Sequence, residues 1–535
     1  MNNSICLLQY TNAFDFMSVS DLDDTVQAQT TGGLIQGLRY DDYAVFYGIP
    51  FAAPPVGPAR WQPPTDPESW QPKVLDARYP QFGCPQNCEL PPGTCPTNTS
   101  ENCLYLNVFV PISALPLGPN DATRPVMAFL PGGRFEQGAA ATVLYNARTM
   151  VNSSDAIVVT INYRLGVLGF LITDEFSGNY GFLDQRQALM WIQNNIAYFG
   201  GDRTRVTLCG QSAGATSIAA HITSPLSFGL FHQAISESNP YLLDLKTREI
   251  ETKNSMNFAK AVGCPTADAS CLYQLTPEEI IQGQIKAQNE IDILIPLALF
   301  LPWTPTVDGT EIFDQPINLI KQGKFYEIPM IVGTCMEEAL LFIYQAANKS
   351  ISKFEYEIGM DGLFLNLDDA KQVIAQYPPI SGDNRPVLSV IGTDYIFVCP
   401  NRNMTRYLSR SETIYTYQFQ HVLSFDAWGP LYPNCVGHVC HGSELPFVFN
   451  SASLGGYTFT PDEQTLAYAM NNYWMNFVVN GNPNIGLPVP TQWPTFNETG
   501  DQTLIFQAPT PYVESGLLSQ KCDFWDSMGY DNPVR

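Results

Sequence analysis

The residues with the clearest chemical potential are Gly210-Gln211-Ser212-Ala213-Gly214, which follow a short apolar, β-prone run at 206–209. Small, helix-compatible residues come next, so the stretch predicts a strand, a sharp turn and a helix. A serine hydroxyl is a weak nucleophile unless the backbone presents it beside a base. The glycines permit a strained turn, and the start of a helix offers N–H groups to a developing oxyanion. The stretch predicts nucleophilic catalysis by Ser212; the alternative is an ordinary Gly/Ser loop.

A catalytic serine needs a base and an acidic group that orients the base. In the chain order that accompanies this kind of turn, the acid follows the serine and the histidine follows the acid. The sequence has only five histidines. His221 and His232 come too soon after Ser212, and His421 lies in an alternating, strand-like run. Two candidates for the base remain: His438 and His441.

The elements around this stretch must hold it in a large core. The chain has 535 residues, of which 45% are hydrophobic and 15% charged, and it contains no repeat or low-complexity block. Apolar runs at 103–110, 125–130 and 157–161 predict buried strands, and 181–198 has helical spacing. Strands that alternate with helices predict a mostly parallel sheet covered on both faces. We expect one large domain at 29–535 after a poorly ordered lead-in at 1–28.

The charge and cysteine content narrow the class of protein. With 27 Lys+Arg against 51 Asp+Glu, the net charge of −24 argues against nucleic acid or anionic membranes as partners. Thirteen cysteines, several in local clusters, predict disulfides because their spacing does not match a zinc site. Asn-x-Ser/Thr triplets agree with export and predict glycosylation; the acceptors chosen are Asn98, Asn152, Asn348, Asn403 and Asn497.

The first 29 residues lack the basic and apolar regions of a secretory signal, and no stretch predicts a transmembrane segment. Disulfides and glycosylation nevertheless point to a secreted or extracellular protein. We expect either a start further upstream or another route to an oxidising place, such as a particle surface.

Further motifs carry a resemblance. Together with the serine turn, they resemble the type-B carboxylesterase/cholinesterase family from about residue 30 to the C-terminus. The motifs include Gly48-Ile49-Pro50, Glu101-Asn102-Cys103-Leu104-Tyr105-Leu106-Asn107-Val108, Asn162-Tyr163-Arg164-Leu165-Gly166, Phe199-Gly200-Gly201-Asp202 and Tyr473-Trp474-Met475-Asn476-Phe477.

The resemblance implies an α/β-hydrolase fold and a serine carboxylesterase that acts on uncharged esters without a metal or cofactor. It implies Ser212 as nucleophile, Glu338 as the acid and His441 as the base, with Glu337 and His438 as fallbacks. The oxyanion hole would consist of the N–H groups of Gly133, Arg134 and Ala213, and the acyl pocket would contain Leu299, Leu301 and Trp303. The resemblance also implies three disulfides: Cys84–Cys103, Cys264–Cys271 and Cys399–Cys522. Local spacing adds two more, Cys88–Cys95 and Cys435–Cys440.

Three residues depart from the family pattern, the mildest being Ala339, which replaces the glycine after the acidic pair. Arg134 replaces a glycine of the oxyanion loop, and Gln211 stands where most members have glutamate. Glutamine also occurs at this place in juvenile-hormone esterases, so Gln211 does not imply an inactive site. Arg134 is the residue that keeps the alternative open: a weak or inactive recognition or structural protein of the same family. A cholinesterase is disfavoured, because no aromatic residue lies between Cys84 and Cys103 to stack on a quaternary ammonium.

Overall fold

The computed structural model describes residues 24–288, 301–364 and 366–530. Its centre is a 13-stranded sheet with the order β1-β2-β3-β5-β7-β6-β8-β9-β12-β13-β14-β15, with β4 paired to β2. The pairings from β7 through β6, β8, β9, β12 and β13 to β14 are parallel, and the outer ones are mostly antiparallel. The strands are β1 (Thr25–Thr30), β2 (Gly33–Arg39), β3 (Tyr43–Pro50), β4 (Leu75–Asp76), β5 (Tyr105–Pro111), β6 (Arg124–Leu130), β7 (Ile157–Ile161), β8 (Gly201–Gln211), β9 (Gln233–Glu237), β12 (Met330–Cys335), β13 (Ile414–Phe419), β14 (Gln502–Phe506) and β15 (Tyr512–Ser515), with β10 (Lys246–Thr247) and β11 (Thr306–Val307) forming a separate pair.

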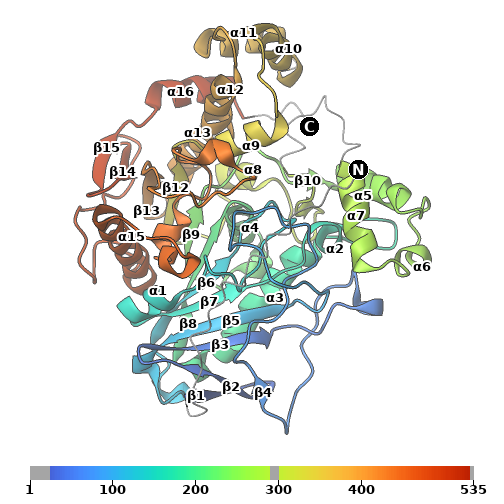
Figure 1. The fold of residues 1–535 in the computed structure, drawn as a ribbon, viewed down its shortest axis with the longest axis vertical. Helices are drawn as coiled ribbons and strands as arrows, with labels where there is room; N and C mark the ends of the chain where they lie inside the picture. Colours follow the sequence, from blue (N-terminus) through green and yellow to red (C-terminus); the bar gives the residue numbers. More distant parts are fainter. Residues whose placement is uncertain (1–23, 289–300, 365, 531–535) are drawn as a thin grey trace, which may run out of the picture.

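Helices cover both faces of this sheet (Figure 1). They are α1 (Arg148–Ser153), α2 (Gly166–Phe170), α3 (Tyr180–Asn195), α4 (Ala213–Ile222), α5 (Arg248–Ala261), α6 (Ala269–Leu272), α7 (Pro277–Gln288), α8 (Pro316–Lys321), α9 (Leu340–Ala346), α10 (Lys353–Leu363), α11 (Leu367–Gln376), α12 (Arg385–Gly392), α13 (Cys399–Leu408), α14 (Leu445–Val448), α15 (Pro461–Asn480) and α16 (Ser519–Met528). A π-helical turn, η7 (Thr393–Val398), joins α12 to α13.

The alternation of side chains along the central strands builds one core on each face of the sheet. In β6, Val126 and Ala128 belong to the core that contains α3 and α4, whereas Met127 and Phe129 belong to the core that contains α1 and α15. A strand buried on both faces needs a continuous apolar run, which is why 125–130 and 157–161 lack polar alternation. The predicted parallel sheet with helices on both faces is confirmed.

The predicted strands and helix lie close to their observed positions. The N-terminal boundary differs, because β1 begins at Thr25, inside the range predicted as a lead-in, and pairs with β2 along its whole length. Residues 1–23 lie outside the described residues.

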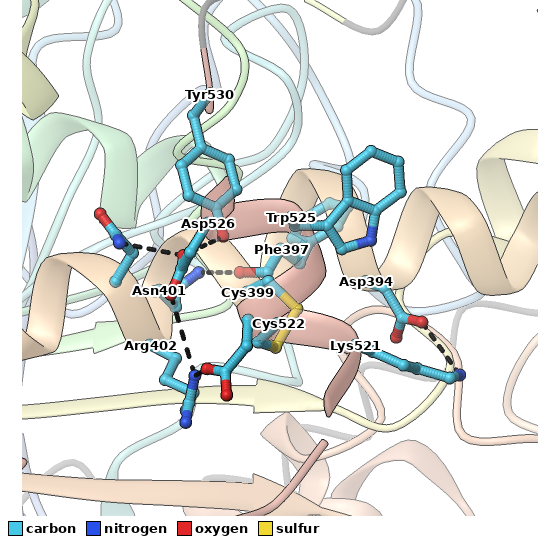
Figure 2. Close-up of a disulfide and its surroundings, with 12 residues drawn as sticks. Asp394, Phe397, Cys399, Asn401, Arg402, Lys521, Cys522, Trp525, Asp526 and Tyr530 are labelled. Atoms are coloured by element: carbon cyan, nitrogen blue, oxygen red, sulfur yellow. Dashed lines mark hydrogen bonds and ion pairs between the residues drawn. A yellow bond between two sulfur atoms is a disulfide. The ribbon is translucent and has the colours of Figure 1, made fainter. Parts of the chain in front are cut away.

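The five predicted disulfides are present: Cys84–Cys103, Cys88–Cys95, Cys264–Cys271, Cys399–Cys522 and Cys435–Cys440. Cys209 and Cys335 are free and buried, and Cys6 lies outside the described residues. Figure 2 shows Cys399–Cys522, which joins the start of α13 to the C-terminal helix α16.

The predicted glycosylation sites differ in their surroundings. Asn98, Asn152, Asn348 and Asn497 are exposed. Asn403, on α13, instead donates its side-chain amide to Asp526 of α16 at 2.9 Å, and Thr405 of the same triplet is buried. A glycan on Asn403 would displace this contact between the two helices.

We expect the Cys399–Cys522 disulfide to contribute more stability than Cys88–Cys95, because their sequence separations are 123 and 7. Loop-closure entropy gives about 5 kcal/mol for the long loop and about 2 kcal/mol for the short one. Urea unfolding of the two double Cys→Ser variants should show this difference in the free energy of unfolding. Equal losses would mean that the two disulfides do not act mainly on the unfolded chain.

Candidate active site

Ser212 stands at the turn between β8 and α4, where the backbone is strained. Its φ of 57° and ψ of −120° lie in a region that non-glycine residues rarely occupy. Its N–H donates to the carbonyl oxygen of Glu237 at 2.9 Å, which ties the turn to β9. A Cβ on Gly214 would lie 2.1 Å from the carbonyl oxygen of Leu130, so only glycine fits there. The predicted strand, turn and helix are confirmed, and they hold Ser212 at the carboxyl end of the sheet.

The loop after β12 brings Glu338 to His441. Oε2 of Glu338 lies 2.5 Å from Nδ1 of His441, and Oε1 accepts from the backbone N–H of Cys335 at 2.7 Å. The glutamate is fully buried. Because a carboxylate can only accept, Nδ1 carries the hydrogen, and the lone pair of the neutral imidazole is on Nε2.

The two fallback residues pair with each other instead. Nδ1 of His438 lies 2.9 Å from Oε1 of Glu337, on the protein surface. Glu337 also holds the loop before His441, because its Oε2 accepts from the N–H of Val439 at 2.8 Å and its own N–H donates to the carbonyl oxygen of Val439 at 3.0 Å. Glu337 and His438 therefore position the two loops rather than line the cleft.

The π-helical turn η7 packs against His441 and the loop that carries Glu338. The rings of Phe397 and of Phe342, on α9, each lie 5.2 Å from the imidazole of His441. Oγ1 of Thr393 accepts from the N–H of Ala339, beside Glu338, at 3.0 Å. Figure 2 shows that η7 is itself held by α16, through the ion pair of Asp394 with Lys521 and the adjacent disulfide. Rare π-helical turns often mark functional sites, and this one orients both the acid loop and the imidazole.

The loop after β6 packs against the serine turn. A Cβ on Gly132 would lie 2.7 Å from the carbonyl oxygen of Gln211, and Gly133 has a φ of 122°. Arg134 adopts a φ of 62°, so it occupies the glycine-like conformation expected from its place in the pattern. Ala213 is the first residue of α4, and its N–H has no intrahelical acceptor. The predicted oxyanion donors thus come from two segments that meet at Ser212.

The side chain of Arg134 lines the cleft, where its Nη2 lies 3.3 Å from Oε2 of Glu136. Burial raises the pKa of Glu136, and the Arg134 guanidinium lowers it in part. Gln284 and Gln288 also donate to this carboxylate. The arginine charge is therefore matched by an acid of its own loop.

Ser212, His441 and residues 132–134 open into one cleft of about 1250 Å³, which includes its mouth. Among the described lining residues, the acidic and basic side chains other than the histidine are Glu89 and Arg134. Aromatic residues form much of the wall: Tyr145, Phe342, Phe425, Trp428, Tyr432 and Tyr457. Such a cleft favours an uncharged, largely apolar ligand.

The predicted acyl pocket receives no support from this geometry. Leu301 and Trp303 are buried, and neither is among the described residues that line the cleft. Leu299 lies outside the described residues. Most of the described residues that line the cleft belong instead to 89–94 and 423–457. These segments are distant from Ser212 in the sequence, so short motifs did not identify them.

The contact at Nε2 of His441 could not be predicted from the sequence. Within the described residues this nitrogen lies 3.1 Å from Nε2 of Gln211, and no hydrogen bond joins it to the Ser212 hydroxyl. Gln211 was noted only as a departure from the family pattern. A contact between residues 230 positions apart leaves no signal in one sequence.

Two further carboxylates lie buried behind the acid loop. Oε2 of Glu444 accepts from Sγ of Cys335 at 2.8 Å, and burial, aided by nearby Glu338, raises the pKa of Glu444 to about 7. Glu237 accepts from the Trp474 indole at 2.6 Å, and burial raises its pKa well above the ordinary value. In the described ranges, no group of three or more His, Cys, Asp and Glu residues could hold a metal ion.

The sequence profile of the carboxylesterase family matches residues 23–525. This chain belongs to the carboxylesterase family. Two Dictyostelium discoideum relatives resemble it along nearly their whole length. The cAMP-regulated D2 protein is 41% identical over 512 residues, which cover 95% of this chain and 93% of the relative. The Crystal protein is 39% identical over 548 residues, which cover 99% and 98%.

Solved structures of esterases resemble this carboxylesterase-family chain as well. A PNB esterase aligns with a TM-score of 0.78 and 30% identity, and a thermophilic PNB esterase with 0.80 and 29%. Each alignment covers 93% of this chain and 99% of the other. The fold is therefore the α/β-hydrolase fold, as the motifs predicted.

The raised pKa of Glu444 makes stability depend on pH. An unfolded glutamate titrates near pH 4.3, whereas folded Glu444 titrates at about 7. Between these values the folded protein keeps a proton that the unfolded chain has lost, so the free energy of unfolding falls as pH rises. We expect the melting temperature of Glu444→Gln to fall less than that of the wild type between about pH 5 and pH 8.

The exposed Glu249→Gln variant is the control, because it also removes one carboxylate. It should show the wild-type slope of melting temperature against pH. If Glu444→Gln and Glu249→Gln have the same slope, Glu444 is ionised at the same pH in the folded and unfolded chains.

Proposed function

We propose that this protein is a serine carboxylesterase that hydrolyses uncharged carboxylic esters through an acyl-Ser212 intermediate. One observation carries the proposal: Ser212 and His441 line the same cleft, and Glu338 is hydrogen-bonded to Nδ1 of the His441 imidazole. Membership in the carboxylesterase family supports ester hydrolysis in general.

In this mechanism Oγ of Ser212 attacks the ester carbonyl carbon while Nε2 of His441 takes the hydroxyl proton. Glu338 holds Nδ1–H and stabilises the imidazolium. The N–H groups of Gly133, Arg134 and Ala213 stabilise the oxyanion of the tetrahedral intermediate. The intermediate collapses, the carbon–oxygen bond to the alcohol breaks, and Nε2–H protonates the leaving oxygen. Water then repeats the sequence on the acyl-serine and releases the carboxylic acid.

The aromatic walls and the paired charge of Arg134 favour neutral, largely apolar esters as substrates. No described helix is long and apolar enough to cross a membrane. Five disulfides support a protein that works in an oxidising, extracellular place. The exposed predicted acceptors Asn98, Asn152, Asn348 and Asn497 suit glycosylation on that route.

A catalytically weak recognition or structural protein is the second candidate. Arg134 in the oxyanion loop and the Gln211 contact at Nε2 of His441 favour it. Neither Dictyostelium relative has a name that states a reaction.

We expect Ser212→Ala and His441→Gln each to lower kcat/KM for p-nitrophenyl butyrate by at least about a thousandfold, because nucleophile and base act as a unit. A fluorophosphonate probe should label the wild type and not Ser212→Ala. His438→Gln is the matched control, since it lies on the same loop but pairs with Glu337. If the folded wild type neither labels nor turns over neutral esters, the second candidate is correct.

We expect Arg134→Gly to leave the preference between anionic and neutral esters unchanged within about threefold, because Glu136 already balances the guanidinium. The ratio of kcat/KM for p-nitrophenyl hemisuccinate and p-nitrophenyl butyrate measures this preference. A selective loss of hemisuccinate turnover would show instead that Arg134 binds the substrate carboxylate.

A further inference from the structure

The nitrogen that must accept the serine proton is already occupied in the structure. Nε2 of His441 lies 3.1 Å from the amide nitrogen of Gln211, and the other imidazole nitrogen is bonded to Glu338. With the hydrogen of the neutral imidazole on Nδ1, Nε2 offers one in-plane lone pair, and the Gln211 N–H donates to it. The amide therefore uses the lone pair on which activation of Ser212 depends.

Gln211 lies in a slot that fits its amide closely. It is 4% exposed and is the last residue of β8, directly before the serine. Its Oε1 would lie 2.7 Å from a Cβ on Gly132, and its Nε2 would lie 3.8 Å from a Cβ on Gly442. The amide thus bridges the oxyanion loop on one side and the histidine loop on the other, and the absence of a side chain at Gly132 makes room for it.

The two partners of Nε2 differ in what they do during the reaction. Ser212 gives up its proton to Nε2, whereas an amide N–H at this place does not transfer one. The amide stabilises the neutral imidazole and disfavours the imidazolium, because two N–H groups would then face each other. Rotation of the amide by 180° would present Oε1 to Nε2–H and reverse this effect.

We propose that Gln211 caps Nε2 of His441 in the resting protein, so that Ser212 is activated only when the amide moves aside. This inference rests on the proposed esterase function and adds a control step at the same site. In this role Gln211 is a positioning residue, and replacing it by an equally long side chain without a donor should accelerate acylation.

Among the residues that the structure describes, the charged groups that face His441 are Glu338, bonded to Nδ1, and Glu444, which lies beside Glu338. Both stay unchanged in the variants below, so a shift in the titration of His441 reports on the Nε2 side. Phe342 and Phe397 cover the ring and carry no charge.

The experiment compares Gln211→Met and Gln211→Glu with the wild type. Met removes the donor at similar length, and an ionised Glu accepts from Nε2–H. We expect Gln211→Met to react with a fluorophosphonate about three- to tenfold faster at the pH plateau, the range that one neutral hydrogen bond allows. The midpoint of the His441 titration, followed by ¹⁵N NMR, should move to higher pH in the Gln211→Met variant and further in the Gln211→Glu variant. The acid limb of kcat/KM for p-nitrophenyl butyrate should move with it.

Gln185→Met is the matched control. Gln185 is a buried glutamine whose Oε1 lies 3.1 Å from Nε2 of another histidine, His221, outside the cleft. Breaking this pair should lower stability without accelerating phosphonylation or moving the His441 titration. An acceleration of the same size in Gln185→Met would assign the effect to general loosening and overturn the cap.

The remaining outcomes separate the cap from the proposed function. If Gln211→Met has the wild-type His441 midpoint and the wild-type phosphonylation rate, the amide does not compete with Ser212 and the inference fails. If the wild type and both Gln211 variants are unreactive while the His441 midpoint still moves, the cap stands and the esterase proposal fails.

Discussion

The hydrogen bond between Glu338 and His441 is the interaction on which the rest of the site depends. It joins residues that are 103 positions apart in the sequence. It also offsets the desolvation of the fully buried Glu338 carboxylate, because burying a charge without partners costs several kcal/mol. Parallel strands make the bond possible, because the loops that follow β12 and β13 emerge at the same edge of the sheet. Two hydrogen bonds between Glu337 and Val439, one between backbone groups and one from the Val439 N–H to the Glu337 carboxylate, then fix the distance between these loops. The fold therefore positions the His441 imidazole before any ligand is bound.

Burial explains why two carboxyl groups near this hydrogen bond, those of Glu237 and Glu444, have raised pKa values. Glu237, Glu338 and Glu444 are all inaccessible to solvent, and carboxylates in such surroundings cannot all be ionised. Glu338 has a backbone N–H and an imidazole as donors, whereas Glu444 has a thiol as a donor and Glu237 an indole. The protons therefore favour Glu237 and Glu444. Glu338 is the one of these three carboxylates that is hydrogen-bonded to the imidazole.

Much of this arrangement could be predicted from local patterns. Ser212 was identified by its flanking glycines, the strands at 125–130 and 157–161 by apolar runs, and the disulfides by cysteine spacing and resemblance. Features that need three-dimensional proximity were missed. Gln211 meets His441 only after the chain folds, and Glu444 becomes unusual only because Cys335 and Glu338 pack against it. Leu301 and Trp303 came from a short alignment; both are buried, and their place in an acyl pocket stays a prediction.

The attachment of η7 to α16 makes the proposed site depend on a segment that is synthesised long after Ser212. Phe397 and Thr393 orient His441 and the acid loop, while Asp394 and the neighbouring disulfide anchor η7 to α16. A nascent polypeptide whose residues 519–528 are still within the ribosome lacks this support, although Ser212 and its strand were made long before. For the proposed esterase, we therefore expect hydrolytic competence to arise only after α16 has emerged from the ribosome and Cys399 and Cys522 have been oxidised to a disulfide.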